Sequence, residues 1–367
     1  MKNHLYALVI AATMLFVPLV ASGTDLSVNI SLLGDLNGEV YPPSGVPGDT
    51  IIQFPDRNFE AVVRAIIHRP YEDDIFASDV AEITELDVSR LGIADLTGIE
   101  YFTALEKLSC SGNQLTTLHV SHNPALMVLL CDINELTMLD VSQNPVLEEL
   151  YCFENALTAL DVSRNPALKK LYCDVNELVV LDVSDSVALE CLDCGGNQLT
   201  ALDVSHNVAL KELDCGWNFL TTLDVTHNPA LEWFGCSDNQ LAMVDVSHNP
   251  SLKGFDCSRN ELRKVDVSLN SLLEGLYCAT NALTALGVSQ NPALEELSCG
   301  ENQLLTLDVS QNPALVKLYC ENNQLATLDV SHNPALITLW CYNNRFPDKS
   351  AIIDLDENRL IEFAFDR

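Results

Sequence analysis

The sequence predicts a mainly β protein: a curved, right-handed solenoid of 21-residue coils with parallel sheets and a helical N-terminal cap. Twelve of the thirteen cysteines recur every 21 residues, from Cys110 to Cys341. An asparagine follows each of them by three residues, and a leucine follows by five in every complete repeat. A fixed period of this length is typical of chains that stack one short unit on the next. It overrides the two or three domains that 367 residues would otherwise suggest.

The first element is an export signal. Residues 1–23 contain one basic residue, an apolar run from Leu5 to Val20 and small residues near Gly23, which is typical of a secretory signal peptide. An uncleaved anchor is the alternative, but the run contains Pro18 and is shorter than the ~20 residues that span a bilayer. We therefore expect an exported, soluble chain with no membrane insertion after cleavage.

Residues 24–50 form a linker containing "YPPSGVPGD", and residues 51–85 form an N-terminal cap. The stretch "GDLNGE" at 34–39 has part of a calcium-loop pattern but lacks its second half. Within 54–68, apolar residues follow a helical spacing at Phe59, Val62, Val63, Ile66 and Ile67. A helix here would cover the apolar surface and unpaired edge of the first coil.

Residues 86–345 are the repeats, and "LxxLxCxxNxL" within them is the leucine-rich-repeat signature with cysteine in one leucine position. Alternation in Leu-x-Cys and in Leu-Asp-Val points Leu, Cys and Val inward, so we expect two parallel sheets on opposite sides of each coil. The asparagine after each cysteine should bond backbone groups at a bend, and that of Asn-Pro should cap a short turn. Residues 346–367 form a C-terminal cap.

The cysteine period argues against a disulfide framework or a metal site. Side chains on neighbouring parallel strands stay ~4.8 Å apart, whereas a disulfide prefers Cβ atoms ~3.8 Å apart. Zinc needs four converging ligands rather than a row. We expect the twelve cysteines to be small core residues. Cys191 lies outside the period and should point outward as an incidental free thiol with no basic neighbour, the only one readily alkylated in the native protein.

The net charge of −33 excludes nucleic acid as a partner, since a phosphate backbone would be repelled. The chain has no Gly-rich phosphate loop and no nucleophile paired with a base, so we expect no enzyme activity and no cofactor.

The sequence resembles bacterial internalins. "FPDRNFEAVVRAI" followed by "ITELDVSRLGIADLTGIEYFTALEKL" is similar to their N-terminal cap and first repeat, and the 21-residue Cys repeats are similar to the internalin J type with its reduced cysteine ladder. The resemblance covers residues 51–345. It implies an extracellular adhesin or host-interaction module without catalytic residues. The sequence departs from the family in lacking downstream mucin-binding-type repeats and a wall anchor, which puts attachment to the producer's own surface in doubt.

Outward residues of the cysteine-bearing sheet vary while the scaffold does not, and exposed aromatics on a rigid sheet are typical of binding surfaces. The alternative is that aromatics merely favour strands. The predicted ligand-binding residues of this concave face are Tyr151, Phe153, Tyr172, Asp193, Asp214, Trp217, Trp233, Asp256, Tyr277, Tyr319 and Trp340.

Two polar rows lie on the opposite side of the coils. The aspartates that recur from Asp140 to Asp329 should be held by Ser and Thr hydrogen bonds rather than by Ca²⁺. His206, His227 and His248 share one position on adjacent coils, and we interpret it as a tolerant exposed position rather than a metal site.

We therefore expect a secreted or surface-associated, monomeric protein that binds a protein or glycan on its concave sheet, with the periplasm as the alternative location. The alternatives are a structural envelope module without a dedicated ligand, and a secreted enzyme inhibitor.

Overall fold

The computed structural model describes residues 49–365. The chain divides into two units, 1–44 and 45–367, and the second is described here by itself. The expected signal peptide and the "GDLNGE" stretch lie outside the described residues, as does all of the linker except its last two residues.

The N-terminal cap is built around helix α2, Arg57–Ile67. Asp56 starts it by accepting hydrogen bonds from the backbone of Asn58 and Phe59. Phe59 and Val63 form its buried face, and Phe59 stacks against Phe102 of the first coil, with ring centroids 6.3 Å apart. The predicted helix is confirmed. The short helix α3, Ala77–Val80, and 3₁₀ turns at Ile99–Tyr101 and Lys349–Ala351 are the remaining helical elements of the described residues.

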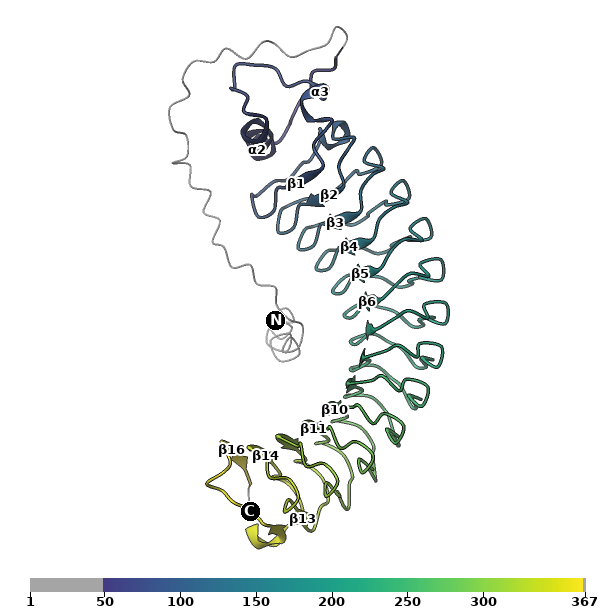
Figure 1. The fold of residues 1–367 in the computed structure, drawn as a ribbon, viewed down its shortest axis with the longest axis vertical. Helices are drawn as coiled ribbons and strands as arrows, with labels where there is room; N and C mark the ends of the chain where they lie inside the picture. Colours follow the sequence, from purple (N-terminus) through teal and green to yellow (C-terminus); the bar gives the residue numbers. More distant parts are fainter. Residues whose placement is uncertain (1–48, 366–367) are drawn as a thin grey trace. The chain divides into compact units, whose positions relative to one another are not determined.

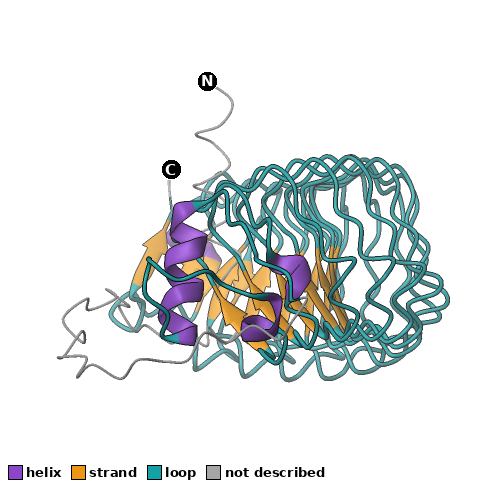
Figure 2. Ribbon diagram, turned by 90° about the horizontal axis from the view of Figure 1, so that it is seen from above, coloured by secondary structure: helices purple, strands orange, loops and turns teal. Residues whose placement is uncertain are grey.

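The repeats form one 14-stranded parallel sheet in strictly sequential order. Each strand pairs with the same three positions of the next coil; Leu150, for example, lies opposite Leu171. In Figures 1 and 2 the short strands line the inner side of the curved solenoid and longer loops form its outer side. The strands are β1 Glu85–Asp87, β2 Lys107–Ser109, β3 Val128–Leu130, β4 Glu149–Tyr151, β5 Lys170–Tyr172, β6 Cys191–Asp193, β7 Glu212–Asp214, β8 Trp233–Gly235, β9 Gly254–Asp256, β10 Gly275–Tyr277, β11 Glu296–Ser298, β12 Lys317–Tyr319, β14 Thr338–Trp340 and β16 Glu362–Ala364.

The core consists of stacked leucines, valines and cysteines. All twelve periodic cysteines are fully buried, as expected for small core residues, and burial raises the pKa of thiols such as Cys173 and Cys215. Each cysteine backbone N–H continues the sheet; that of Cys173 donates to the Asp193 carbonyl at 2.8 Å. The cysteine ladder is therefore part of the packing.

The second sheet is much smaller than the sequence pattern predicts. On the Leu-Asp-Val side, the described residues form one strand pair, β13 (Leu328–Asp329) with β15 (Ile352–Ile353), and two isolated bridges. The aspartate explains the difference: Asp161 Oδ1 accepts from the backbone N–H of Ser163 at 2.9 Å and turns the chain. The valine carbonyl then bonds the turn and the next coil rather than a neighbouring strand.

Two asparagine ladders join the coils. After each cysteine, the asparagine bonds the bend as predicted: Asn197 donates to the carbonyls of Cys173 and Cys194 at 3.0 Å and accepts from Leu178 N–H. The asparagine of Asn-Pro acts differently from the predicted cap. Asn228 donates to the carbonyls of Val204 and Asn207 on the preceding coil, at 3.0 and 2.9 Å. Both ladders are scaffold.

Candidate functional site

The concave face is formed by the first and third residues of each strand. The middle residue, Leu or Phe in every strand from β2 to β12, is buried in the core, so its neighbours point outward. Of the eleven predicted binding residues, nine occupy these outward positions. Trp233 is the first residue of β8, and the others are third residues of their strands: Tyr151, Tyr172, Asp193, Asp214, Asp256, Tyr277, Tyr319 and Trp340.

Two predicted residues lie beyond the strands. Phe153 follows Cys152 and is half-buried. Trp217 sits in the tight turn after Cys215 with φ of 54°, a left-handed backbone conformation, and is 39% exposed. The alternation of the strand ends at the cysteine and the chain bends before Asn218, so Trp217 lies beyond the outward positions of β7.

Aromatic residues form separate groups along the sheet. Tyr151 and Tyr172 stack on adjacent strands with ring centroids 4.7 Å apart and an interplanar angle of 12°. Tyr319 and Trp340 meet edge to face at 5.1 Å near the C-terminal end. Such pairs are rigid and present large apolar surfaces at low entropic cost.

A third pair, Trp233 and Tyr277, bridges three strands in the middle of the sheet. Its ring centroids lie 6.4 Å apart at an angle of 55°. Trp233 comes from β8 and Tyr277 from β10, so the strand between them, β9, must leave room for the rings. It does so with Gly254.

An acidic centre lies between the Tyr151–Tyr172 pair and the Trp233–Tyr277 pair. Asp193 and Asp214 are paired in register on β6 and β7, and their Oδ1 atoms lie 3.4 and 3.6 Å from the position that a Cβ on Gly195 would occupy. Burial raises the pKa of Asp193 above its ordinary value and that of Asp214 to about 6.

The structure adds Asp174 to this centre, a residue absent from the predicted set. It follows Cys173, in the same position as Phe153, and burial together with Asp214 raises its pKa to about 7. The sequence signal was its position directly after a ladder cysteine, where Asp132 stands two coils earlier.

Cys191 is the first residue of β6 and is half-buried, unlike the twelve ladder cysteines. Burial, followed by the nearby Glu212 carboxylate, raises its pKa to about 11. The expectation that no basic residue adjoins it was wrong, since Lys170 is its register partner on β5. The favourable effect of Lys170 on the thiolate is smaller than the effect of burial.

The polar rows on the other side of the coils are held locally. Asp224 Oδ1 accepts from both the N–H and the hydroxyl of Thr226, at 2.9 and 2.7 Å, which confirms the predicted Ser and Thr bonding. These hydrogen bonds lower the pKa of Asp224. His206, His227 and His248 are exposed. Within residues 49–365, no group of three or more His, Cys, Asp or Glu side chains is arranged to hold a metal ion.

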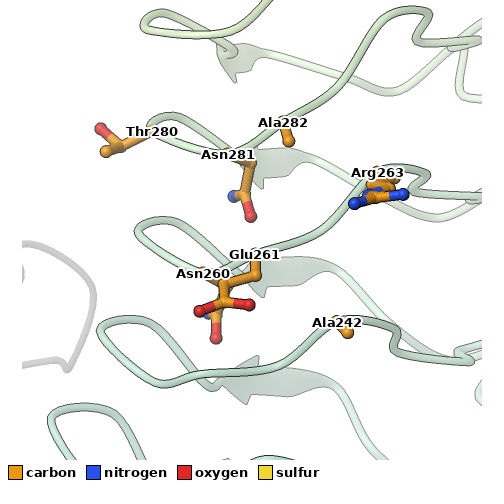
Figure 3. A pocket seen from close by; sticks show the side chains of 7 residues that line it. All are labelled: Ala242, Asn260, Glu261, Arg263, Thr280, Asn281 and Ala282. Atoms are coloured by element: carbon orange, nitrogen blue, oxygen red, sulfur yellow. The ribbon is translucent and has the colours of Figure 1, made fainter.

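One hollow lies on the flank of the solenoid, between consecutive coils (Figure 3). Asn260 and Asn281 belong to the first asparagine ladder, so their amides are already bonded to backbone. Glu261 and Arg263 are the charged residues of the hollow, and both are exposed. None of the predicted binding residues lines it. The hollow is lined by Ala242, Asn260, Glu261, Arg263, Thr280, Asn281 and Ala282.

No helix among the described residues is long and apolar enough to cross a bilayer. With its single long parallel sheet, 21-residue coils and stacked buried cysteines, the chain is a leucine-rich-repeat solenoid with a cysteine ladder.

Comparison with known proteins identifies the family. The functional domain of internalin J from Listeria monocytogenes is 35% identical, with a TM-score of 0.60 over 82% of this chain and 78% of that one. The chain therefore belongs to the internalin family. Such leucine-rich-repeat proteins are typically binding proteins of the host-interaction kind rather than enzymes.

Two further comparisons agree. Internalin J of Listeria monocytogenes serotype 4b (strain F2365) is 44% identical over 70 residues, a match that spans 19% of this chain but only 8% of the length of that protein. The structure of internalin InlF from Listeria monocytogenes strain 4b F2365 has a TM-score of 0.73 at 23% identity, over 83% of this chain and 96% of that chain, and shows the shared fold. No protein-family model matches the sequence.

Proposed function

We propose that this chain is a secreted or surface-associated, non-enzymatic binding protein of the adhesin or host-interaction type. It recognises a protein or glycan on its concave sheet and acts as a monomer. The observation that carries the proposal is the contrast between the two sides of each strand. The inward residues are almost invariant Leu and Cys, whereas the outward residues change from coil to coil and include the three aromatic pairs and the acidic centre.

The test is retention on candidate host cells and on a glycan array. The triple variant Tyr172→Ala, Trp233→Ala and Trp340→Ala removes one member of each aromatic pair. We expect it to lose at least tenfold in binding with a melting temperature close to that of the wild type, since these side chains are outside the core.

The matched control changes three exposed apolar residues away from the sheet: Met138→Ala, Val180→Ala and Met243→Ala. They are 75%, 71% and 72% exposed and share one position of the repeat. Binding that survives the sheet variant, or that the control variant removes equally, would reject the concave face. No specific retention by the wild type would favour the structural envelope module instead.

The proposed export rests on the pattern of residues 1–23. Expression in a bacterial host should release a product whose N-terminal sequence begins close to residue 24. A product that keeps residues 1–23 and remains with the membrane fraction would contradict the signal peptide.

A further inference from the structure

Three consecutive strands in the middle of the sheet carry a glycine at an outward position. These are Gly235 on β8, Gly254 on β9 and Gly275 on β10. Glycine weakens a strand and often marks a place where another group approaches closely. None of the three has a positive φ, so the backbone conformation does not require glycine. Glycine is therefore explained by the lack of space for a side chain above these three positions.

Each glycine is covered by a neighbouring side chain. A Cβ on Gly254 would lie 2.1 Å from Cε3 of Trp233, so the indole ring of β8 lies across β9. A Cβ on Gly235 would lie 2.7 Å from Oδ2 of Asp214, so this carboxylate leans across β8. A Cβ on Gly275 would lie 3.1 Å from Cε2 of Tyr277. Because the glycines have no side chain, the rings of Trp233 and Tyr277 and the carboxylate of Asp214 can lie flat against the sheet.

The two rings are surrounded by carboxylates. Asp256 shares β9 with Gly254 and points to the same face, and Asp214 lies over Gly235. Glu212 is the register partner of Trp233, and burial, followed by the nearby Glu296 carboxylate, raises the pKa of Tyr277. We call Trp233, Tyr277, Asp214 and Asp256 the central platform.

The cations near the central platform are already paired. Lys211, Lys253 and Lys317 bind Glu190, Glu232 and Glu296 at 2.6, 2.7 and 3.1 Å. The carboxylates of Asp214 and Asp256 are not the partners in these ion pairs. Arg259, whose charge also acts on Asp256, is paired with Asp238 at 3.8 Å.

Ring faces attract ammonium and guanidinium groups, and carboxylates beside them bind a guanidinium in bidentate fashion. A neutral sugar can stack on the rings and donate hydroxyl hydrogen bonds to the carboxylates, but it has no positive charge to pair with them. Building on the proposed binding function, we infer that the central platform binds arginine or lysine side chains of a basic protein segment. The net charge of −33 adds long-range attraction for such a segment.

The probe is a fluorescently labelled nona-arginine peptide, titrated into the full-length protein and followed by anisotropy at two salt concentrations. Because the whole chain is acidic, the decisive variant keeps every charge: Trp233→Leu. We expect a loss of at least fivefold in affinity from Trp233→Leu, and a similar loss from Asp256→Asn. Tyr71→Leu removes an exposed aromatic ring of the N-terminal cap, likewise without a change of charge, and should change the affinity less than twofold.

Gly254→Val serves as a second variant, because its side chain would displace the indole ring without removing it. It should weaken binding as Trp233→Leu does. Melting curves check that each variant is folded.

Three results would overturn the inference. The first is an equal affinity of wild type and Trp233→Leu for the peptide. The second is an equal loss in Tyr71→Leu. The third is tight binding of a neutral oligosaccharide that depends on Trp233 and does not change with salt. The last result would leave the proposed binding function intact and reject only the basic partner, whereas failure of the triple variant to reduce cell retention would reject the proposed function itself.

Discussion

Replacing Ser186 with asparagine should stabilise the protein. All the remaining coils from Asn123 to Asn333 have asparagine at this position, and its Nδ2 donates to two carbonyls of the preceding coil. Asn165, for example, donates to the carbonyls of Val141 and Asn144, at 3.0 and 2.9 Å. Ser186 is fully buried, and its hydroxyl has no hydrogen-bond partner. The second asparagine ladder is therefore interrupted at one coil.

The magnitude follows from the missing bonds. The asparagine introduced by Ser186→Asn would donate to the carbonyls of Val162 and Asn165, and each buried hydrogen bond contributes about 1 kcal/mol. The Oδ1 atoms of the ladder asparagines lack a hydrogen-bond partner, and so does the Ser186 hydroxyl. The cost of burying one unpaired oxygen is therefore the same before and after the substitution. The net gain is about 2 kcal/mol. With an unfolding entropy of about 2.1 cal/mol/K per residue over about 320 residues, the melting temperature should rise by about 3 °C.

Scanning calorimetry of Ser186→Asn measures this shift, and Asn228→Ser provides the matched control. Asn228 bonds Val204 and Asn207 in an intact part of the ladder, so its replacement should lower the melting temperature by a similar amount. An unchanged or lower melting temperature for Ser186→Asn, together with a clear loss for Asn228→Ser, would refute the reasoning. It would mean that the coil around Ser186 has no room for the amide.

Three further predictions concern the thiol, the acidic centre and the aspartate ladder. Mild alkylation of the native protein should label Cys191 alone, with a rate that rises about tenfold per pH unit below its pKa of about 11; mass mapping that finds several labelled cysteines would contradict this. Asp214→Asn should raise the melting temperature by roughly 2 °C at pH 8 and much less at pH 4, because a folded-state pKa raised to about 6 makes the wild type lose stability as pH rises from about 4 to 6; equal shifts at both pH values would argue against it. Calorimetric titration with Ca²⁺ should show no binding heat, since serine and threonine already satisfy carboxylates such as Asp224; a saturable heat would show a calcium site.

The period alone determined most of the fold. Because every coil must satisfy the same inward contacts, the leucine, cysteine and first asparagine positions could be assigned from spacing, and the capping helix followed from its apolar face. The near absence of the second sheet could not be predicted from spacing. Leu-Asp-Val alternates like a strand, but the aspartate side chain turns the backbone at Ser163. The alternation of apolar and polar residues does not show whether a backbone N–H donates to a neighbouring strand or to a nearby aspartate side chain.

The candidate site was predictable in its position but not in its detail. Outward residues such as Tyr172 and Asp214 follow from the strand pattern. The central platform does not follow from the strand pattern. The space for the Trp233 ring is left by Gly254, which lies 21 residues away in the sequence and beside it in the sheet. Nor does adjacency in the sequence show that Trp217 lies past the end of its strand, in a turn where its backbone has a positive φ.

The stretch from β7 to β10 combines features that do not favour stability. Three outward glycines weaken the strands, and desolvation raises the pKa of Asp214 and Asp256, so each ionised carboxylate costs free energy in the folded state. Elsewhere on the same sheet, outward positions hold Ser298 or Thr338, which fit a strand at no such cost. A scaffold under selection for stability alone would not collect these features on adjacent coils, whereas a surface that needs flat rings and desolvated charge requires them together. This clustering, more than the number of aromatics, distinguishes a binding surface from the ordinary preference of aromatics for strands.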